Sequence, residues 1–138
     1  MAMDYRRLNV WQKSMMLVKN VYPLIERLPP EEKYALGNQI RRAVTSIVLN
    51  IAEGTGRNSD KELRYFLTIA RGSATEVEAQ LFICIELGFF PKEDAISALQ
   101  LCDELKGMLY RFIQRVEANQ RNGKQKTVLD EIDLYGDL

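Results

Sequence analysis

The chain has 138 residues, enough for one domain with its own core and too few for two to be expected. Its composition, 46% apolar and 28% charged, is that of an ordinary globular domain. No apolar run approaches the roughly 20 residues of a membrane span and no secretory leader opens the chain, so we expect a cytoplasmic protein. The net charge is zero, but residues 1–71 carry twelve Lys and Arg against seven Asp and Glu, and residues 72–138 carry the reverse. This layout predicts an electrostatically polarised molecule.

The residue types exclude several kinds of site. Histidine is absent, and the two cysteines, Cys84 and Cys102, fall at apolar helical positions, where we expect buried, reduced thiols. We therefore expect neither a metal nor a cofactor. We expect no enzymatic activity either, because the commonest general base is missing. An enzyme would need a concave pocket that holds Glu53 or Glu76 with a displaced pKa.

The first helix is predicted over residues 8–28. Its expected apolar face comprises Trp11, Met15, Val18, Tyr22 and Ile25. Pro23 should bend or break this helix, because proline lacks an N–H and crowds the preceding turn. A second helix is expected to begin near Glu31, whose charge suits a helix N-terminus, and to stop at the sequence Gly54-Thr55-Gly56.

The third helix begins with a capping box formed by Ser59 and Glu62 and closes at Gly88. Its apolar and small residues follow the four-three spacing of a packed seam: Leu63, Leu67, Ala70, Ala74, Val77, Leu81 and Cys84. A fourth helix is expected from about Pro91, with Ala98, Cys102, Leu105, Leu109, Phe112 and Val116 on its apolar face. Short connections make sequential helices antiparallel neighbours. The sequence therefore predicts an all-α, up-down-up-down four-helix bundle over residues 1–118.

The character of the chain changes at Asn119. Residues 119–126 are expected to form a mobile polar linker, and residues 127–138 form a short acidic amphipathic segment. Two interpretations remain open: a disordered tail, or a tail that docks Leu129, Ile132 and Tyr135 onto the basic surface of a neighbouring copy.

Helices two and three carry polar stripes beside their apolar faces. Together, the apolar face and the polar stripe of each helix are wider than the contact surface that a four-helix bundle needs. The extra width indicates burial against another molecule, and the simplest partner is a second copy of the chain. The alternative is that these polar groups face water. The candidate oligomer-interface residues are Gln39, Ser46, Asn50, Phe66, Ser73, Glu76 and Gln80.

Glu53 stands at a helix C-terminus, where the helix dipole disfavours a carboxylate. Arg57 and the free amides of the next helix can offset that cost, so Glu53, Gly54 and Gly56 are expected to form a structural corner between helices two and three. The sequence Gly-Thr-Gly-Arg is not a phosphate loop, because no strand precedes it and the Gly-Lys-Ser/Thr pattern is missing.

Basic residues give the strongest functional lead. A hairpin about Gly56 is expected to bring Arg42 level with Arg71, with further cations at the turn. Arginine suits phosphate oxygens, and without a groove-reading motif we expect backbone or shape recognition of nucleic acid. The alternative is ordinary ion pairing, for example of Arg42 with Glu76 or of Arg64 with Asp60. The candidate nucleic-acid-binding residues are Arg6, Arg7, Lys13, Arg41, Arg42, Arg57, Lys61, Arg64 and Arg71.

Several motifs in order resemble one known family. They are Val10-Trp11-Gln12-Lys13, Gln39-Ile40-Arg41-Arg42-Ala43, Asn50-Ile51-Ala52-Glu53-Gly54 and Ile69-Ala70-Arg71-Gly72-Ser73. They look like the four-helix-bundle proteins encoded in intervening sequences of bacterial 23S rRNA genes, which are similar to the accessory variability determinant of diversity-generating retroelements. The resemblance covers about residues 4–118.

The resemblance implies a small bundle that assembles as a ring-like homopentamer and has no known enzymatic activity. The retroelement relative binds nucleic acid and a reverse transcriptase through a basic surface, and by analogy Arg41, Arg42 and Arg71 become candidates for such contacts. This chain departs from that relative in being neutral overall. Our leading hypothesis is a non-enzymatic, oligomeric protein that associates with structured RNA or DNA. The alternative is a scaffold that holds a protein partner such as a reverse transcriptase.

Overall fold

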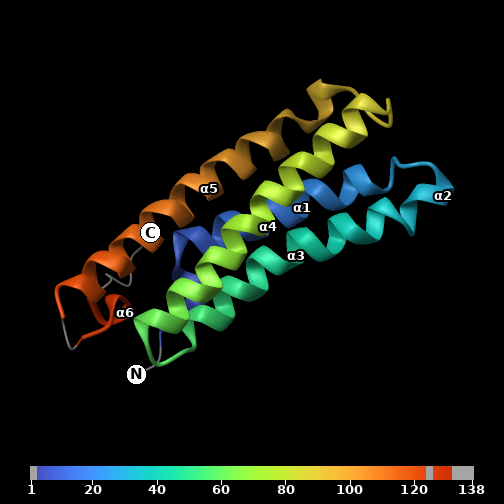
Figure 1. The fold of residues 1–138 in the computed structure, drawn as a ribbon. Coiled ribbons are helices and arrows are strands. Elements are labelled where there is room, and N and C mark those ends of the chain that lie inside the picture. Colours follow the sequence, from blue (N-terminus) through green and yellow to red (C-terminus); the bar gives the residue numbers. More distant parts are fainter. Residues whose placement is uncertain (1–2, 124–125, 132–138) are drawn as a thin grey trace.

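The protein is represented by a computed structural model that describes residues 3–123 and 126–131. Within those residues every regular element is helical, which confirms the predicted all-α class. The elements are η1 (Tyr5–Arg7), α1 (Asn9–Ile25), α2 (Pro30–Lys33), α3 (Leu36–Thr55), α4 (Asp60–Glu86), α5 (Lys92–Arg121) and α6 (Val128–Glu131). The four long helices lie side by side in an elongated bundle, and successive long helices run in opposite directions (Figure 1). In the described part of the chain, no helix has the length and apolarity needed to cross a bilayer.

Each long helix contacts two others. Helix α4 packs between α3 and α5, and α1 contacts α3 and α5 on the opposite side. The predicted seam of α4 is buried throughout, as is the predicted apolar face of α5. Cys84 and Cys102 are buried and unpaired, as predicted. Burial of this continuous apolar stripe is the main stabilising contribution to such a bundle.

The predicted apolar face of α1 is wrong by one position. Helix α1 buries Val10, Ser14, Leu17, Val21 and Leu24, together with Ile25. The predicted Trp11, Met15 and Val18 are half-buried, and Tyr22 is exposed. Ser14 explains the error, because a polar residue occupies the centre of the core stripe. Its hydroxyl donates to the Trp11 carbonyl at 2.6 Å, which satisfies it without water.

The connection between α1 and α3 also differs from the prediction. Helix α1 continues through Pro23 and ends two residues later. The second long helix begins at Leu36, not near Glu31, because α2 and a break precede it. Side chains support this break: the Arg41 guanidinium donates to the Lys33 carbonyl at 3.0 Å, and Asn38 donates to the Tyr34 carbonyl at 2.9 Å. These bonds satisfy carbonyls that a continuous helix would pair internally.

The α3–α4 corner is closely packed. A Cβ placed on Gly54 would lie 2.9 Å from the Phe66 Cβ, so the two helices approach each other more closely there than side chains permit. Glu53 forms an ion pair with Arg57, whose guanidinium lies 4.9 Å from the centre of the Phe66 ring. The predicted capping box is confirmed in part: the Ser59 hydroxyl accepts from the Glu62 amide at 3.2 Å, and the Glu62 carboxylate accepts from the Ser59 hydroxyl at 3.1 Å. Gly56 ends α3 with an ordinary φ of −85°, so its backbone does not require glycine.

The C-terminal part of the described chain folds back onto this corner. Helix α5 runs three residues past the predicted boundary at 118, and Asn119 is a buried helical residue, not the start of a linker. The Asp60 carboxylate accepts from the Val128 amide at 3.0 Å and from the Asn119 side chain. Val128 is buried. The predicted docking residues Ile132 and Tyr135 lie outside the described residues.

Candidate nucleic-acid interface

The described Lys and Arg side chains fall into two groups, those that form an ion pair with a carboxylate and those that do not. Among the described residues, the cations that have a carboxylate within 4 Å are Arg6, Lys13, Arg27, Lys33, Arg41, Arg57, Arg64 and Lys106. No described carboxylate lies that close to Arg7, Lys19, Arg42, Lys61, Arg71, Lys92, Arg111, Arg115, Arg121 and Lys126. A cation without a paired carboxylate is free to exchange its counterions for phosphates.

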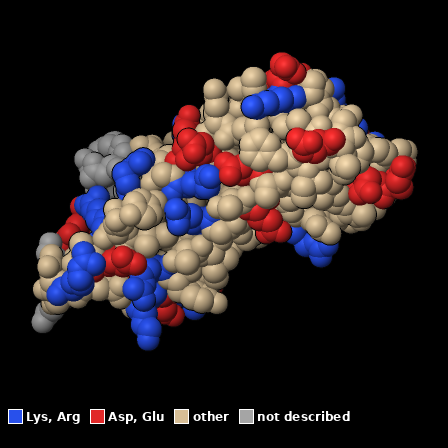
Figure 2. All heavy atoms as spheres, turned by 45° about the horizontal axis from the view of Figure 1, so that its top comes forward, with Lys and Arg blue, Asp and Glu red and all other residues tan. Residues whose placement is uncertain are grey.

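Five arginines lie on the first half of α4 and the second half of α5, which occupy the same end of the bundle. We call them the basic face: Arg64, Arg71, Arg111, Arg115 and Arg121. Two cross-helix contacts align the two segments. Arg64 lies 3.9 Å from the Glu117 carboxylate, and the Arg71 guanidinium lies 5.2 Å from the centre of the Tyr110 ring. Figure 2 shows Lys and Arg concentrated at this end of the molecule.

An aromatic ring lies beside Arg71, at the edge of the basic face nearest the middle of the bundle. Tyr110 is half exposed, and its hydroxyl accepts a hydrogen bond from the Gln114 amide at 2.7 Å. Because Arg71 lies over one side of the ring, the cation and the aromatic surface are presented together. Exposed aromatic rings among cations can stack on nucleobases whatever their sequence.

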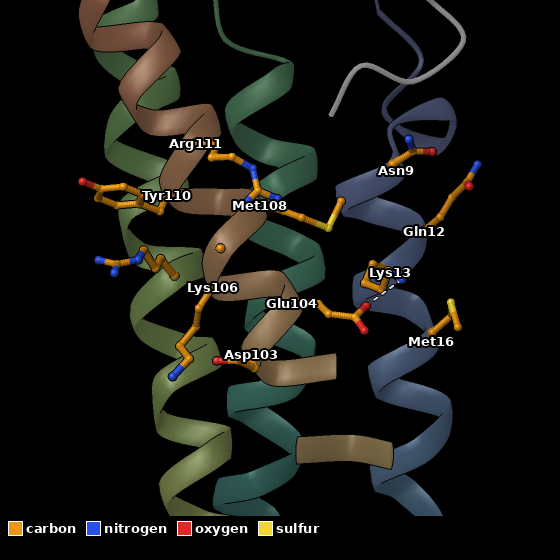
Figure 3. Close-up of a pocket in the computed structure, with 12 residues that line it drawn as sticks. Asn9, Gln12, Lys13, Met16, Asp103, Glu104, Lys106, Met108, Tyr110 and Arg111 are labelled. Carbon is orange, nitrogen blue, oxygen red and sulfur yellow. Dashed lines mark ion pairs between the residues drawn. The ribbon is translucent and has the colours of Figure 1, made fainter. Parts of the chain in front are cut away.

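A shallow groove of about 1010 Å³ follows α5 on its α1 side (Figure 3). Met16 and Met108 give it an apolar part, and Lys13 bridges it through an ion pair with Glu104 at 2.8 Å. The Arg111 guanidinium extends over α5 toward Gly107, where a Cβ would lie 3.2 Å from its Nη1. The groove is mixed in chemistry, with a cation, an ion pair and thioether carbons side by side.

Several carboxylates without a described ion pair lie at the opposite end of the bundle. Glu31 and Glu32 lie on α2, Glu86 ends α4 and Glu93 opens α5, and none of them has a described cation within ion-pair distance. The molecule is therefore polarised between its two ends. The halves of the sequence do not correspond to these ends, because each long helix runs the length of the bundle.

The predicted arginine pair does not come together. The Ser73 hydroxyl donates to the Ser46 hydroxyl at 3.0 Å, and this contact sets the register of α3 against α4. Residue 42 is therefore level with residues near 77, about two helical turns from Arg71. The alternative ion pairs are absent as well. Arg64 pairs with Glu117, and no described carboxylate lies within 4 Å of Arg42.

The remaining predicted cations are dispersed. Arg6 binds the Asp4 carboxylate through its side chain, and this hydrogen bond lowers the pKa of Asp4. Arg41 is engaged at the α2–α3 break, where it also lies 3.7 Å from the Glu26 carboxylate. Arg7 and Lys61 are exposed near the same end of the bundle as the basic face. Of the predicted set, only Arg64 and Arg71 belong to that face.

Sequence reasoning missed Arg111, Arg115 and Arg121. Their signal is an arginine series on α5 that avoids its apolar stripe. It was hidden because the second half of the chain is acidic on average. Each long helix runs the length of the bundle, so any half of the sequence contains residues from both ends and its net charge averages the two. The basic end becomes visible only when the charges are counted for each end of the folded bundle.

The predicted oligomer-interface residues divide into two groups. Ser73 is buried and bonded to Ser46 of α3, and Asn50 donates to the same Ser46 hydroxyl at 2.9 Å. Gln80 is buried as well; its amide donates to the Glu76 carboxylate, and its side-chain oxygen has no partner among the described residues. Ser73 and Asn50 therefore do not by themselves require a second copy. Gln39 and Glu76 are exposed and Phe66 is half-buried. The structure also exposes apolar side chains that the polar stripe did not predict: Tyr65 and Ile83 on α4, Leu87 directly after it, and Leu49 on α3.

Comparison with known proteins identifies the family. The family model described as 23S rRNA-intervening sequence protein matches residues 6–111. The chain belongs to the 23S rRNA-intervening sequence protein family. A solved structure from Bacteroides thetaiotaomicron, described as a protein of unknown function from the S23 ribosomal protein family, is similar at 30% identity and a TM-score of 0.68. The match covers 75% of this chain and 97% of that one. A comparison with curated proteins gave no match.

This membership confirms the predicted resemblance to the 23S rRNA-intervening sequence proteins, and the likeness to the retroelement determinant stays a prediction. The matched span ends at residue 111, within α5, so it includes Arg64, Arg71 and Tyr110. Arg115 and Arg121 lie beyond it. The basic face thus joins residues of the family region to residues that follow it.

Proposed function

We propose that this protein binds structured RNA through phosphate contacts from the basic face, without enzymatic activity. The observation that carries the proposal is the set of five arginines at one end of the bundle, four of them with no described carboxylate within 4 Å, together with the exposed Tyr110 ring beside Arg71. The family description, which refers to an intervening sequence of 23S rRNA, supports RNA as the ligand.

The physics of this face favours recognition of the backbone. Guanidinium groups bind phosphate oxygens through two parallel hydrogen bonds, and such contacts position an RNA without reading its bases. If four arginines each contact a phosphate, the logarithm of the binding constant should fall with the logarithm of salt concentration with a slope of about −3 to −4. Tyr110 adds a stacking surface for an unpaired base at the edge of a duplex.

Fluorescence anisotropy with a labelled RNA hairpin tests the proposal. The double variant Arg71→Gln with Arg111→Gln should weaken binding about tenfold or more at low salt and reduce the salt slope by about two. The matched control, Lys19→Gln with Lys92→Gln, removes the same charge from cations outside the basic face and should bind nearly as the parent does. Equal affinities for the two double variants, or no binding by the parent chain, would contradict the proposal.

Self-association is the second part of the proposed function. The exposed Tyr65 and Ile83 lie on the outward side of α4, and Leu49 of α3 is 65% exposed. Aligned apolar side chains of this kind suit a contact between copies. The family resemblance implies a ring-like homopentamer. Light scattering after size exclusion should give five times the chain mass, and Tyr65→Ser with Ile83→Ser should reduce it, whereas Ile96→Ser on α5 should not. A monomeric parent would contradict this part.

One observation favours the alternative function as a protein scaffold. The acidic end of the bundle exposes Tyr34, Leu87 and Ile96, which are 79%, 60% and 42% exposed. An apolar surface with carboxylates around it suits a basic protein partner such as a reverse transcriptase. Binding of a purified reverse transcriptase that is lost in Leu87→Ser with Ile96→Ser, and kept in Arg71→Gln with Arg111→Gln, would favour the scaffold over RNA binding.

A further inference from the structure

The groove between α1 and α5 reaches the basic face at Arg111 and differs from it in chemistry (Figure 3). At its centre the Lys13 ammonium lies 2.8 Å from the Glu104 carboxylate, and these side chains are 30% and 51% exposed. Met108 follows Glu104 by about one turn of α5, and Met16, which is 48% exposed, follows Lys13 by about one turn of α1. Because the two helices run antiparallel, the methionines lie on opposite sides of an accessible ion pair.

Charged side chains are distributed unevenly along the groove. They are Lys13, Arg71, Asp103, Glu104, Lys106 and Arg111. Lys106 is engaged in an ion pair with α4 at 2.9 Å, and Asp103 points away from α1 with no described cation within 4 Å (Figure 3). Because the Lys13–Glu104 pair is neutral in sum, Asp103 makes this part of the groove acidic. Arg111 makes the other part basic, so a phosphate is favoured there and disfavoured beside the carboxylates.

The ion pair matches the Watson–Crick edge of an unpaired guanine. On that edge the N1–H and N2–H groups donate side by side, and O6 next to them accepts. The two oxygens of Glu104 can accept from both donors while the Lys13 ammonium donates to O6, and hydrogen bonds to charged groups are stronger than neutral ones. Each of the other three RNA bases has one donor group on this edge, so none offers the adjacent pair of donors that the carboxylate can accept. The thioether side chains beside the pair suit the faces of the ring.

The length of the groove fits one nucleotide. Arg111 lies seven residues beyond Glu104, about 10 Å along α5, which is comparable to the reach of a nucleotide from its base edge to its phosphate. A base within a duplex cannot use the ion pair, because its partner base already occupies the same edge. An unpaired base next to a duplex can turn outward at a lower cost. The groove therefore favours RNA that carries an unpaired nucleotide.

We infer that the groove between α1 and α5 binds an unpaired guanine of the RNA, with Glu104 and Lys13 on its Watson–Crick edge and Arg111 on its phosphate. The inference rests on the RNA binding proposed above and names the class of RNA, a duplex with an unpaired guanine. The duplex itself lies on the remaining arginines of the basic face. Phosphate contacts then supply most of the affinity, and the groove supplies the preference for one base.

A set of labelled RNA duplexes tests the site by fluorescence anisotropy. The duplexes are identical except that one strand carries a bulged guanosine, a bulged inosine, a bulged uridine or no bulge. Inosine lacks only the N2 amino group of guanosine. The parent chain should bind the guanosine bulge about 10-fold more tightly than the uridine bulge or the plain duplex, and about 5-fold more tightly than the inosine bulge. Equal affinities across the set would overturn the guanine site and leave RNA binding intact. Absence of binding to every duplex would remove the proposed function, and the guanine site with it.

Glu104→Gln tests which side chain distinguishes the bases. It keeps the size of the side chain but replaces an accepting oxygen with a donor, so the preference for guanosine over inosine should fall from about 5-fold to nearly none. The ratio of affinities is the readout, because loss of a negative charge raises the affinity for every RNA. The matched control, Asp103→Asn, removes the neighbouring carboxylate and should raise all affinities while it keeps the ratio. A ratio that survives in Glu104→Gln, or that Asp103→Asn abolishes as well, would overturn the assignment of the guanine edge to the ion pair.

Discussion

Replacement of Gly54 by alanine should separate α3 from α4 at their corner. In the folded chain an alanine Cβ at this position would lie 2.9 Å from the Phe66 Cβ and 3.3 Å from a Leu63 methyl carbon. The Phe66 Cβ is attached to the α4 backbone, so it cannot move aside by a change of rotamer. Relief requires the two helices to shift apart by roughly half an ångström or more, because carbon atoms pack at about 3.5–4.0 Å.

The expected change in the free energy of unfolding is the sum of two opposing contributions. Overpacking of a rigid contact costs about 1–3 kcal/mol, and replacing glycine by alanine inside a helix recovers about 1 kcal/mol. We expect a net loss of about 1 kcal/mol, and of about 2 kcal/mol at most, in the free energy of unfolding. For a chain of this size the midpoint of thermal unfolding should fall by about 3–4 °C for each kcal/mol lost. Circular dichroism at 222 nm on heating, together with urea titration, measures both quantities.

Gly56→Ala is the matched control two residues away. There a Cβ would lie 3.6 Å from the carbonyl oxygens of Ala52 and Glu53, and the backbone φ of −85° suits any residue. Alanine should therefore stabilise the protein by about 0.5 kcal/mol, since it restricts the unfolded chain. If Gly54→Ala proved as stable as Gly56→Ala, the reasoning from close helix approach would be refuted.

Two further predictions concern the buried polar and sulfur groups. Asp60→Ala should leave the Val128 amide without its acceptor and lower the free energy of unfolding by about 1–2 kcal/mol. Hydrogen exchange should become faster at residues 126–131 and stay slow in the core of α4. Unchanged exchange at residues 126–131 would contradict the role given to Asp60. Burial raises the pKa of the Cys84 thiol to about 11 and that of Cys102 to about 12, from an unperturbed 9.0. The unfolded chain therefore loses these protons first as pH rises, so each thiol should lower stability by about 1 kcal/mol between pH 9 and pH 10. Urea midpoints across this range should fall less in Cys84→Ala with Cys102→Ala, and an equal fall would count against the prediction.

The sequence predicted the structure best where a single local pattern determines it. The seam of α4 from Leu63 to Cys84 could be predicted because its four-three spacing has no competing pattern, and every residue of it is buried. Ser59 and Glu62 predicted the start of that helix because the capping bonds are local. Such signals depend on neighbours within four residues, which the sequence shows directly.

The sequence-based predictions were wrong or incomplete where hydrogen bonds or contacts that the residue pattern does not show determine the structure. Ser14 occupies a core position because its own helix satisfies the hydroxyl, and a pattern based on polarity cannot detect this. The basic face could be predicted only in part, because the alignment of Arg71 with Tyr110 depends on how α4 and α5 slide past each other. Asn119 was assigned to a linker since its partners, Asp60 and the Lys126 carbonyl, come from before and after its helix.

An excess of arginine at one end of the bundle and of carboxylate at the other gives this neutral chain a dipole. A polyanion in solution exerts a torque on such a particle, which turns the arginine-bearing end toward it before any contact forms. The association rate should then exceed that expected for a molecule with no net charge, and added salt should slow arrival as well as hasten departure. A zero net charge is therefore compatible with fast, directed encounters with nucleic acid.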